Sequence, residues 1–334
     1  MDSNRYFFCF PRGGLSDVSN VIWFCFNYCK KYSRILVIDT RYLISFGDDI
    51  RKYFIFKDDP IIYTGDLNSI YDIFNNSYKT YFPLKLTTEN IKNIKRDINL
   101  SYNSDYKIDN ISLTIDLDKD YPHNIITYSN CRGCGNILNF FSMISHVSDI
   151  IMKPFIQRYE ILPKDYISAH VRYSDRKSDI NTFIEDNNEV FKNNKIFLAT
   201  DSYHILQKFI NIYGDENICS FSNLQHDKQN SETDKPLHFR KKDNIQEFII
   251  DCVCDMFLLC YGKEYYYSNS NSGYSKNVSY IRDNIEELNR ITRNNIGIEE
   301  LYICKNIFDK LNFNMNYFFI LFMFISVVII MLIK

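Results

Sequence analysis

The sequence has no excess of either charge and is poor in glycine and proline. Its 334 residues contain 39 lysines and arginines against 41 aspartates and glutamates, a formal net charge of -2. A protein that binds nucleic acid through its phosphates needs a basic surface, so this balance argues against a nucleic-acid partner. Beside 10 glycines and 7 prolines stand 26 tyrosines and 27 phenylalanines. We attribute this composition to AT-rich coding and draw no functional conclusion from the aromatic residues.

Several motifs that would assign a function are missing or incomplete. The apolar run at the amino terminus is too short for a signal peptide, because Pro11 follows it at once. Gly13 and Gly14 do not belong to a G-x-G-x-x-G fingerprint, which argues against a dinucleotide site. Cys131 and Cys134 form one C-x-x-C pair without a second, so structural zinc is not indicated. Most of the 10 cysteines stand in apolar contexts and indicate a reducing compartment rather than a disulfide framework.

The C-terminal end is a long apolar run. Tyr317–Ile333 (YFFILFMFISVVIIMLI) carries no charge and is closed by Lys334. Its length is at the short end of what spans a bilayer, and it lacks the polar stripe of a buried core helix. We therefore expect a linker at 306–316 and a single-pass C-terminal membrane anchor at 317–333, with the globular part in the cytosol. Four N-x-[ST] sequons are expected by chance in so Asn-rich a chain; they begin at Asn75, Asn99, Asn110 and Asn277.

The first forty residues predict a strand, a glycine turn, a helix and a second strand. The strands are Arg5–Phe10 and Ile35–Asp39, and the helix covers Ser16–Lys31 with its apolar residues on one stripe. Gly13-Gly14 in the turn lets the backbone approach a ligand, and the helix N-terminus behind it favours an anion. A glycine pair alone is more often an ordinary turn, so this indication needs support from elsewhere in the chain.

Residues 40–130 predict only scattered elements. One is a strand over Ile111–Asp118 that ends in the pair Asp116-x-Asp118. Such a pair can hold a divalent metal on a sugar nucleotide, but in so acidic a chain we favour a solvated turn. Cys131–Gly135 reads as a turn that leads into a helix over Ile137–Tyr159.

From residue 166 onward strands and helices alternate regularly. The predicted strands are Tyr166–Arg172, Lys195–Thr200, Asn217–Phe221 and Glu264–Ser268, and the predicted helices are Thr182–Lys192, Tyr203–Tyr213, Ile245–Tyr261 and a last pair after the loop Asn269–Gly273. This alternation predicts an α/β fold with a parallel sheet that binds its ligand at the carboxyl ends of the strands. We expect two domains, 1–160 and 161–305.

A cluster of charge stands at the end of the first of these strands. His170 and Arg172 share one face of the strand because side chains alternate, and Asp175, Arg176 and Lys177 follow in the loop. The planar fork of arginine matches phosphate oxygens two at a time. The cluster therefore suits a doubly charged phosphate leaving group.

Two further polar clusters follow later strands. Asp201 can accept hydrogen bonds from a ribose or a base, or it can cap the next helix. Ser272 and Ser275 stand where a helix N-terminus would face a phosphate, although both could equally serve as caps. Asp251 and Asp255 lie four residues apart on an otherwise apolar helix. A carboxylate there needs a partner, so we expect one of them to contact the ligand loops or an arginine.

In this order the motifs resemble the fucosyltransferase superfamily of the α-1,2-, α-1,6- and protein O-fucosyltransferases and the rhizobial nodulation enzyme. The H-x-R-x-x-D motif is matched by His170, Arg172 and Asp175, and the A-T-D-D motif by Ala199-Thr200-Asp201, with Ser202 in place of the last aspartate. The Ser-rich turn is matched by Asn271-Ser272-Gly273-Tyr274-Ser275, and the aspartate of the helix before it by Asp255, or by Asp251 in its place. The Gly-Gly-Leu turn is matched by Gly13-Gly14-Leu15. The resemblance covers about 5–39 and 137–283.

The resemblance implies two facing Rossmann-like domains in the GT-B arrangement, with 1–160 on the acceptor side and 161–305 binding the nucleotide sugar. The implied donor is GDP-fucose or another nucleotide sugar, and the implied acceptor is a glycan or protein. The resemblance also implies inversion at the anomeric carbon and no obligatory metal or other cofactor. The implied nucleotide-sugar site consists of Gly13, Gly14, His170, Arg172, Arg176, Lys177, Asp201, Asp255, Ser272, Tyr274 and Ser275.

Without a metal, fixed cations and donors must meet the charge that grows on the diphosphate. Arg172 is the candidate for this role, and an inverting transfer also needs a base, for which Asp17 and Asp175 are the candidates. Two other interpretations stay open. One is a metal-dependent transferase that uses the Asp116-x-Asp118 pair, and the other is a degenerate transferase domain kept as a membrane-tethered binding or scaffold protein.

Overall fold

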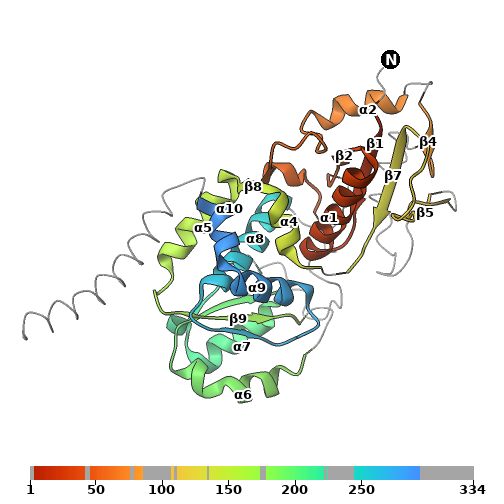
Figure 1. The fold of residues 1–334 in the computed structure, drawn as a ribbon. Helices are drawn as coiled ribbons and strands as arrows, with labels where there is room; N and C mark the ends of the chain where they lie inside the picture. Colours follow the sequence, from red (N-terminus) through yellow and green to blue (C-terminus); the bar gives the residue numbers. More distant parts are fainter. Residues whose placement is uncertain are drawn as a thin grey trace, which may run out of the picture.

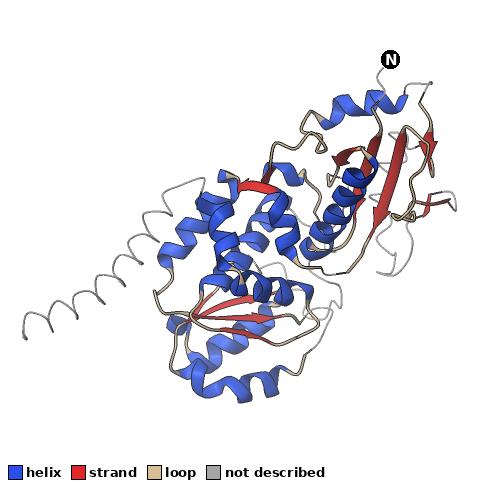
Figure 2. Cartoon of the chain, in the orientation of Figure 1, coloured by secondary structure: helices blue, strands red, loops and turns tan. Residues whose placement is uncertain are grey.

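The structure is a computed structural model that describes residues 4–41, 46–75, 79–85, 107–108, 111–133, 135–173, 178–221, 224 and 244–293. Two parallel sheets with helices on both faces confirm the predicted α/β class (Figure 2). The first sheet contains the N-terminal strands and the second contains the strands from residue 167 onward (Figure 1).

The first sheet has the strand order β2-β1-β7-β4, and all its pairs are parallel. Its strands are β1 (Tyr6–Pro11), β2 (Ile35–Ile38), β4 (Tyr81–Phe82) and β7 (Ile125–Asn130). Every residue of β1 is buried, as expected for a central strand covered on both faces. Helix α1 (Leu15–Tyr32) packs on one face and α2 (Leu67–Asn75) on the other.

The second sheet has the order β11-β10-β9-β12, again all parallel. Its strands are β9 (Ile167–Val171), β10 (Ile196–Thr200), β11 (Ile218–Cys219) and β12 (Tyr265–Tyr267). Helices α6 (Ile180–Lys192) and α7 (Tyr203–Tyr213) cover one face, and α8 (Ile245–Tyr261) and α9 (Gly273–Asp283) the other. The strand order reverses between β9 and β12, where doubly wound sheets bind ligands.

A single buried apolar cluster connects the inner faces of the two sheets. It includes residues of β1 and β10 and of the helices between the sheets, which are α1, α4 (Ile137–Met143), α5 (Asp149–Ile161), α8, α9 and α10 (Ile285–Arg293). Arg290 of α10 also donates to the carbonyls of Phe141 (2.7 Å) and Ile144 (3.0 Å). Both sheets therefore rest on one middle layer of helices (Figure 1). The domain boundary near residue 160 stays a prediction.

The remaining elements are short. They are η1 (Ile50–Lys52), β3 (Phe54–Phe56), β5 (Lys107–Ile108), β6 (Ile111–Ser112), β8 (Ile144–Val147) and η2 (Asp215–Asn217). The predicted continuous helix Ile137–Tyr159 is wrong, because β8 interrupts it and pairs antiparallel with β3. A new helix then begins after its N-cap, Ser148.

The predicted strand Ile111–Asp118 is also wrong beyond Ser112. The carboxylate of Asp116 accepts a hydrogen bond from the backbone N–H of Asp118 (3.0 Å) and lies 3.2 Å from Lys119 Nζ. An Asp side chain that bonds the backbone two residues ahead closes a turn and competes with an extended strand. The preferred interpretation of this pair as a solvated turn is confirmed.

Helices α7 and α8 begin and end where the sequence predicts, and the predicted strands of the second sheet are confirmed, with β11 shorter than expected. None of the helices in the described ranges is long and apolar enough to cross a bilayer. The predicted linker at 306–316 and anchor at 317–333 lie outside the described residues.

Candidate functional site

The turns that follow strand β1 of the first sheet and strand β12 of the second sheet lie close together. β1 leads through Gly13-Gly14 into α1, and β12 leads through the Ser-rich turn into α9. Asn277 Nδ2 of α9 donates to Ser16 Oγ of α1 over 2.8 Å, although the two residues are 261 positions apart. The glycine turn and the Ser-rich turn, which the sequence indicated separately, are therefore neighbours.

His170 connects β9 to the Ser-rich turn. Its Nδ1 lies 2.7 Å from Ser275 Oγ, and its ring centroid is 4.9 Å from that of Tyr274. The residue is only 8% exposed, and burial, followed by the positive charge of Arg172, lowers the pKa of His170 to about 3. The imidazole is consequently neutral near pH 7 and supplies no positive charge to a phosphate. Its contact with Ser275 instead holds the Ser-rich turn against β9.

Arg172 stands just after β9, at the point where the strand order reverses. It is partly exposed, and its carbonyl accepts a hydrogen bond from Ser178 Oγ over 3.3 Å. Ser178 Oγ can in turn accept a hydrogen bond from Ser268 Oγ, 3.0 Å away, which ties the ends of β9 and β12 together. The backbone that carries Arg172 is therefore held firmly at this end of the sheet. Asp175, Arg176 and Lys177 lie outside the described residues.

Asp201 braces the same edge from the neighbouring strand. Its Oδ1 accepts a hydrogen bond from the backbone N–H of Tyr173 over 2.7 Å. The N-cap of α7 is Ser202, so the alternative that Asp201 caps this helix is wrong. The carboxylate holds together the chain segments that follow β9 and β10, and a role toward a nucleotide stays a prediction.

The residues of the Ser-rich turn are mostly engaged within the protein. Ser272 is the N-cap of α9, and its Oγ accepts from the N–H of Ser275 over 3.3 Å, which confirms the capping alternative for Ser272. The hydroxyl of Tyr274 donates to the carbonyl of Cys252 over 2.7 Å, and burial raises the pKa of Tyr274. What this turn offers to an anion is consequently the positive end of α9.

Asp251 and Asp255 have an arginine as partner, one of the two predicted alternatives. Arg158 of α5 donates to Asp251 Oδ1, and its Nη1 lies 3.9 Å from Asp255 Oδ1. The guanidinium also lies 5.6 Å from the ring centroid of Phe221, which follows β11. This contact between α5 and α8 gives the carboxylate of Asp251 a hydrogen-bonded cation, whereas Asp255 has the same cation at a longer distance.

On the first sheet, Asp17 stabilises the glycine turn. Its Oδ2 accepts from the backbone N–H of Gly14 over 3.0 Å, and Gly13 adopts a φ of 99°, which glycine tolerates best. Burial, assisted by the charge of Asp17, raises the pKa of the Cys131 thiol to about 11. Asp17 is itself partly exposed.

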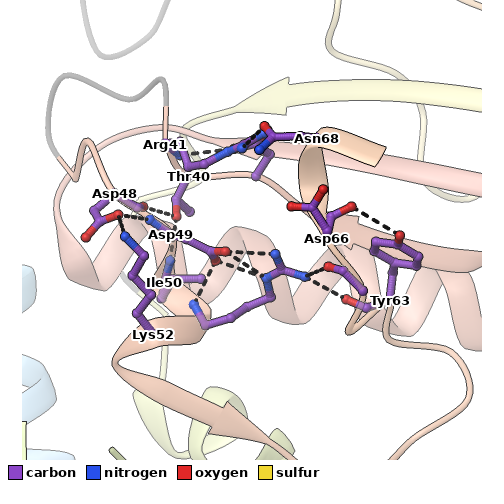
Figure 3. A network of polar contacts seen from close by, with 12 residues as sticks. Thr40, Arg41, Asp48, Asp49, Ile50, Lys52, Tyr63, Asp66 and Asn68 are labelled. Atoms are coloured by element: carbon purple, nitrogen blue, oxygen red, sulfur yellow. Dashed lines mark hydrogen bonds and ion pairs between the residues drawn. The ribbon is translucent and has the colours of Figure 1, made fainter. Parts of the chain in front are cut away.

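A polar network at the end of β2 was missed by sequence reasoning. Asp39 is fully buried, and its two carboxylate oxygens accept from Arg41 over 3.0 and 2.9 Å. Figure 3 shows the surrounding contacts, with Arg41 reaching Asn68 and Asp48 meeting Lys52. The signal was an aspartate and an arginine directly after a buried strand, but it stood at the start of a region without clear periodicity.

Comparisons with known proteins give structural matches only. No protein-family model matches the chain, and no curated protein sequence matches it. The solved structure of NodZ α-1,6-fucosyltransferase soaked with GDP-fucose superimposes with a TM-score of 0.51 at 16% identity, covering 83% of this chain and 92% of that chain. The form of NodZ co-crystallised with GDP gives the same values. A structure of fucosyltransferase NodZ from Bradyrhizobium matches at 16% identity over 83% and 93% of the two chains, with a TM-score of 0.51.

The chain has a fucosyltransferase-like fold. In this fucosyltransferase-like fold, the residues that carry the sequence resemblance gather at two neighbouring edges. His170, Arg172 and Ser275 lie at the second sheet, and Gly13 and Gly14 lie at the first, where the carboxylate of Asp17 accepts from the N–H of Gly14. Within the described ranges, no group of three or more His, Cys, Asp or Glu side chains is arranged to hold a metal ion.

Proposed function

We propose that the chain is a glycosyltransferase that transfers fucose from GDP-fucose to a glycan or protein acceptor. The observation that carries the proposal is the position of Arg172, which lies close to His170 where the strand order reverses between β9 and β12. The fold around it resembles that of a fucosyltransferase whose structure was solved after soaking with GDP-fucose. Doubly wound sheets bind nucleotides at this place. A guanidinium there matches the oxygens of a diphosphate.

In the proposed mechanism the donor lies on the second sheet and the acceptor on the first, which is the GT-B arrangement. As the bond from the anomeric carbon to the diphosphate breaks, negative charge grows on the leaving group. Arg172 and the N-terminal end of α9 would stabilise that charge without a metal. A carboxylate, Asp17 or Asp175, would take the proton of the acceptor hydroxyl during an inverting attack.

We further propose that residues 317–333 anchor the enzyme in a membrane with the catalytic part in the cytosol. The support is the charge-free run of the sequence, which is long enough for a bilayer. No cofactor is needed for the proposed transfer, since the nucleotide sugar already carries the activated bond.

The test is calorimetric binding and slow hydrolysis of GDP-fucose by the full chain in the presence of EDTA. We expect binding that EDTA leaves intact and that GDP-mannose and UDP-sugars do not reproduce. Arg172→Ala should lower the rate of hydrolysis by about two orders of magnitude or more, as loss of a single donor to a developing oxyanion does.

The matched control is Arg5→Ala, which removes another partly exposed arginine. Arg5 pairs with Asp120 at the opposite, amino-terminal edge of the first sheet, 2.6 Å away. This variant should bind and hydrolyse the donor like the wild type. Absence of binding to any GDP-sugar would refute the proposal, and a requirement for Mn²⁺ with a UDP-sugar would refute the choice of donor and the metal-independent mechanism.

A further inference from the structure

A side-chain hydrogen bond links the first turn of α1 to α9 inside an apolar contact. Asn277 is 0% exposed and Ser16 is 7% exposed. Around them, Leu15 and Val18 of α1 and Val278 of α9 belong to the same buried apolar cluster. The bond of 2.8 Å between Asn277 Nδ2 and Ser16 Oγ is therefore shielded from water.

The two residues of this bond are close in sequence to the acceptor side and the donor side of the proposed site. Ser16 precedes Asp17, whose carboxylate holds the N–H of Gly14 and which is one of the two candidate bases. Asn277 stands two residues after Ser275, whose hydroxyl contacts His170 over 2.7 Å. A shift of α1 against α9 would consequently change the position of the acceptor side relative to the donor side.

Stability alone does not explain an asparagine at this place. Among the described residues, the Oδ1 atom of Asn277 is buried and accepts no hydrogen bond. A buried polar atom without a partner is unfavourable, and an apolar side chain of similar size would avoid that cost. Apolar surfaces attract without a preferred direction, whereas a hydrogen bond is satisfied only over a narrow range of distance and angle.

We infer that the hydrogen bond between Ser16 and Asn277 fixes the register of α1 against α9 and thereby aligns the acceptor side with the bound donor. Both are positioning residues, since neither is placed to touch the substrate. The inference rests on the proposed function and adds to it the contact that holds the two halves of the site in reacting geometry. A displacement of about 1 Å in a reacting group can cost about 100-fold in rate.

The test compares Ser16→Ala with Ser19→Ala in the full chain, with GDP-fucose as donor and water as acceptor. Ser19 lies on the same helix and is also buried, but its hydroxyl donates within α1, to the carbonyls of Leu15 (2.9 Å) and Ser16 (3.1 Å). Each variant removes one buried hydroxyl, and only the first removes the contact with α9. We expect Ser16→Ala to lower kcat about tenfold or more with KM within about twofold of the wild type, and Ser19→Ala to change neither constant.

A second arm uses Asn277→Leu and the double variant Ser16→Ala/Asn277→Leu. If the two residues act through one bond, the double variant loses no more rate than the more damaged single variant. Equal kcat for Ser16→Ala, Ser19→Ala and the wild type would overturn the inference and leave the proposed function intact, as would losses that multiply in the double variant. A wild-type chain inert toward GDP-fucose would overturn the proposed function and the inference with it.

Discussion

The buried imidazole of His170 should make the stability of the protein depend on pH between about pH 6.5 and pH 3. In the folded chain, burial and then the charge of Arg172 lower the pKa of His170 to about 3, whereas an unfolded histidine titrates near pH 6.5, about its usual value. Below pH 6.5 the imidazole of His170 therefore binds a proton in the unfolded state but not in the folded state. The stabilisation is fully present above this value and is lost as the pH falls toward 3, by about 1.4 kcal/mol per pH unit.

Between pH 7 and pH 5 this linkage amounts to a loss of about 2 kcal/mol in the free energy of unfolding. The variant His170→Gln has no imidazole to protonate, so it should lack this part of the pH dependence. It should also start lower at pH 7, because the contacts with Ser275 and Tyr274 are lost. The difference between the wild type and the variant should consequently shrink by about 2 kcal/mol from pH 7 to pH 5.

Urea unfolding followed by the fluorescence of Trp23, the single tryptophan, measures this difference at each pH. His204→Gln replaces an exposed histidine on α7 and controls for the loss of one imidazole. Since other groups titrate in the wild type and the variant alike, they cancel in the comparison. A difference between the wild type and His170→Gln that is the same at pH 7 and pH 5 would refute the assignment of a neutral, buried imidazole.

Two further substitutions test the supports of the site. Gly13→Ala places a Cβ 2.5 Å from the side chain of Asp17 at a φ of 99°, so it should cost about 1–3 kcal/mol. Gly133→Ala, at a φ of 66° with nothing within 4 Å of its Cβ, is the control for strain alone and should cost less when both variants are unfolded by urea. Arg158→Met leaves Asp251 buried without its cation and should lower the free energy of unfolding by about 3–5 kcal/mol; a loss below 1 kcal/mol by urea titration would contradict this account.

The second sheet could be predicted from the sequence because its elements are marked locally. Helix α8 is apolar on nearly every side, begins at the N-cap Asn244, and ends at Gly262. The strands β9 and β10 are short apolar runs that end in charged or polar residues. Such signals depend only on neighbouring residues, so one sequence contains enough information to place them.

What could not be predicted depends on residues far apart in the chain. β8 is a strand because it pairs with β3, about ninety residues earlier, and nothing local distinguishes its ISHV from a helical turn. The contacts within the site likewise join residues that are far apart in the sequence. His170 meets Ser275 and Ser16 meets Asn277 only after the fold forms, so the sequence could propose the members of the site but not its contacts.

The buried amide of Asn277 also bears on covalent modification. Asn277-Val278-Ser279 has the form of an N-glycosylation acceptor, yet the folded chain leaves no exposed surface at Asn277 and commits its amide nitrogen to Ser16. A glycan attached there during synthesis would have to occupy the space between α1 and α9. A chain carrying one could not close this contact, so a sugar at Asn277 would mark molecules that never reached the native fold.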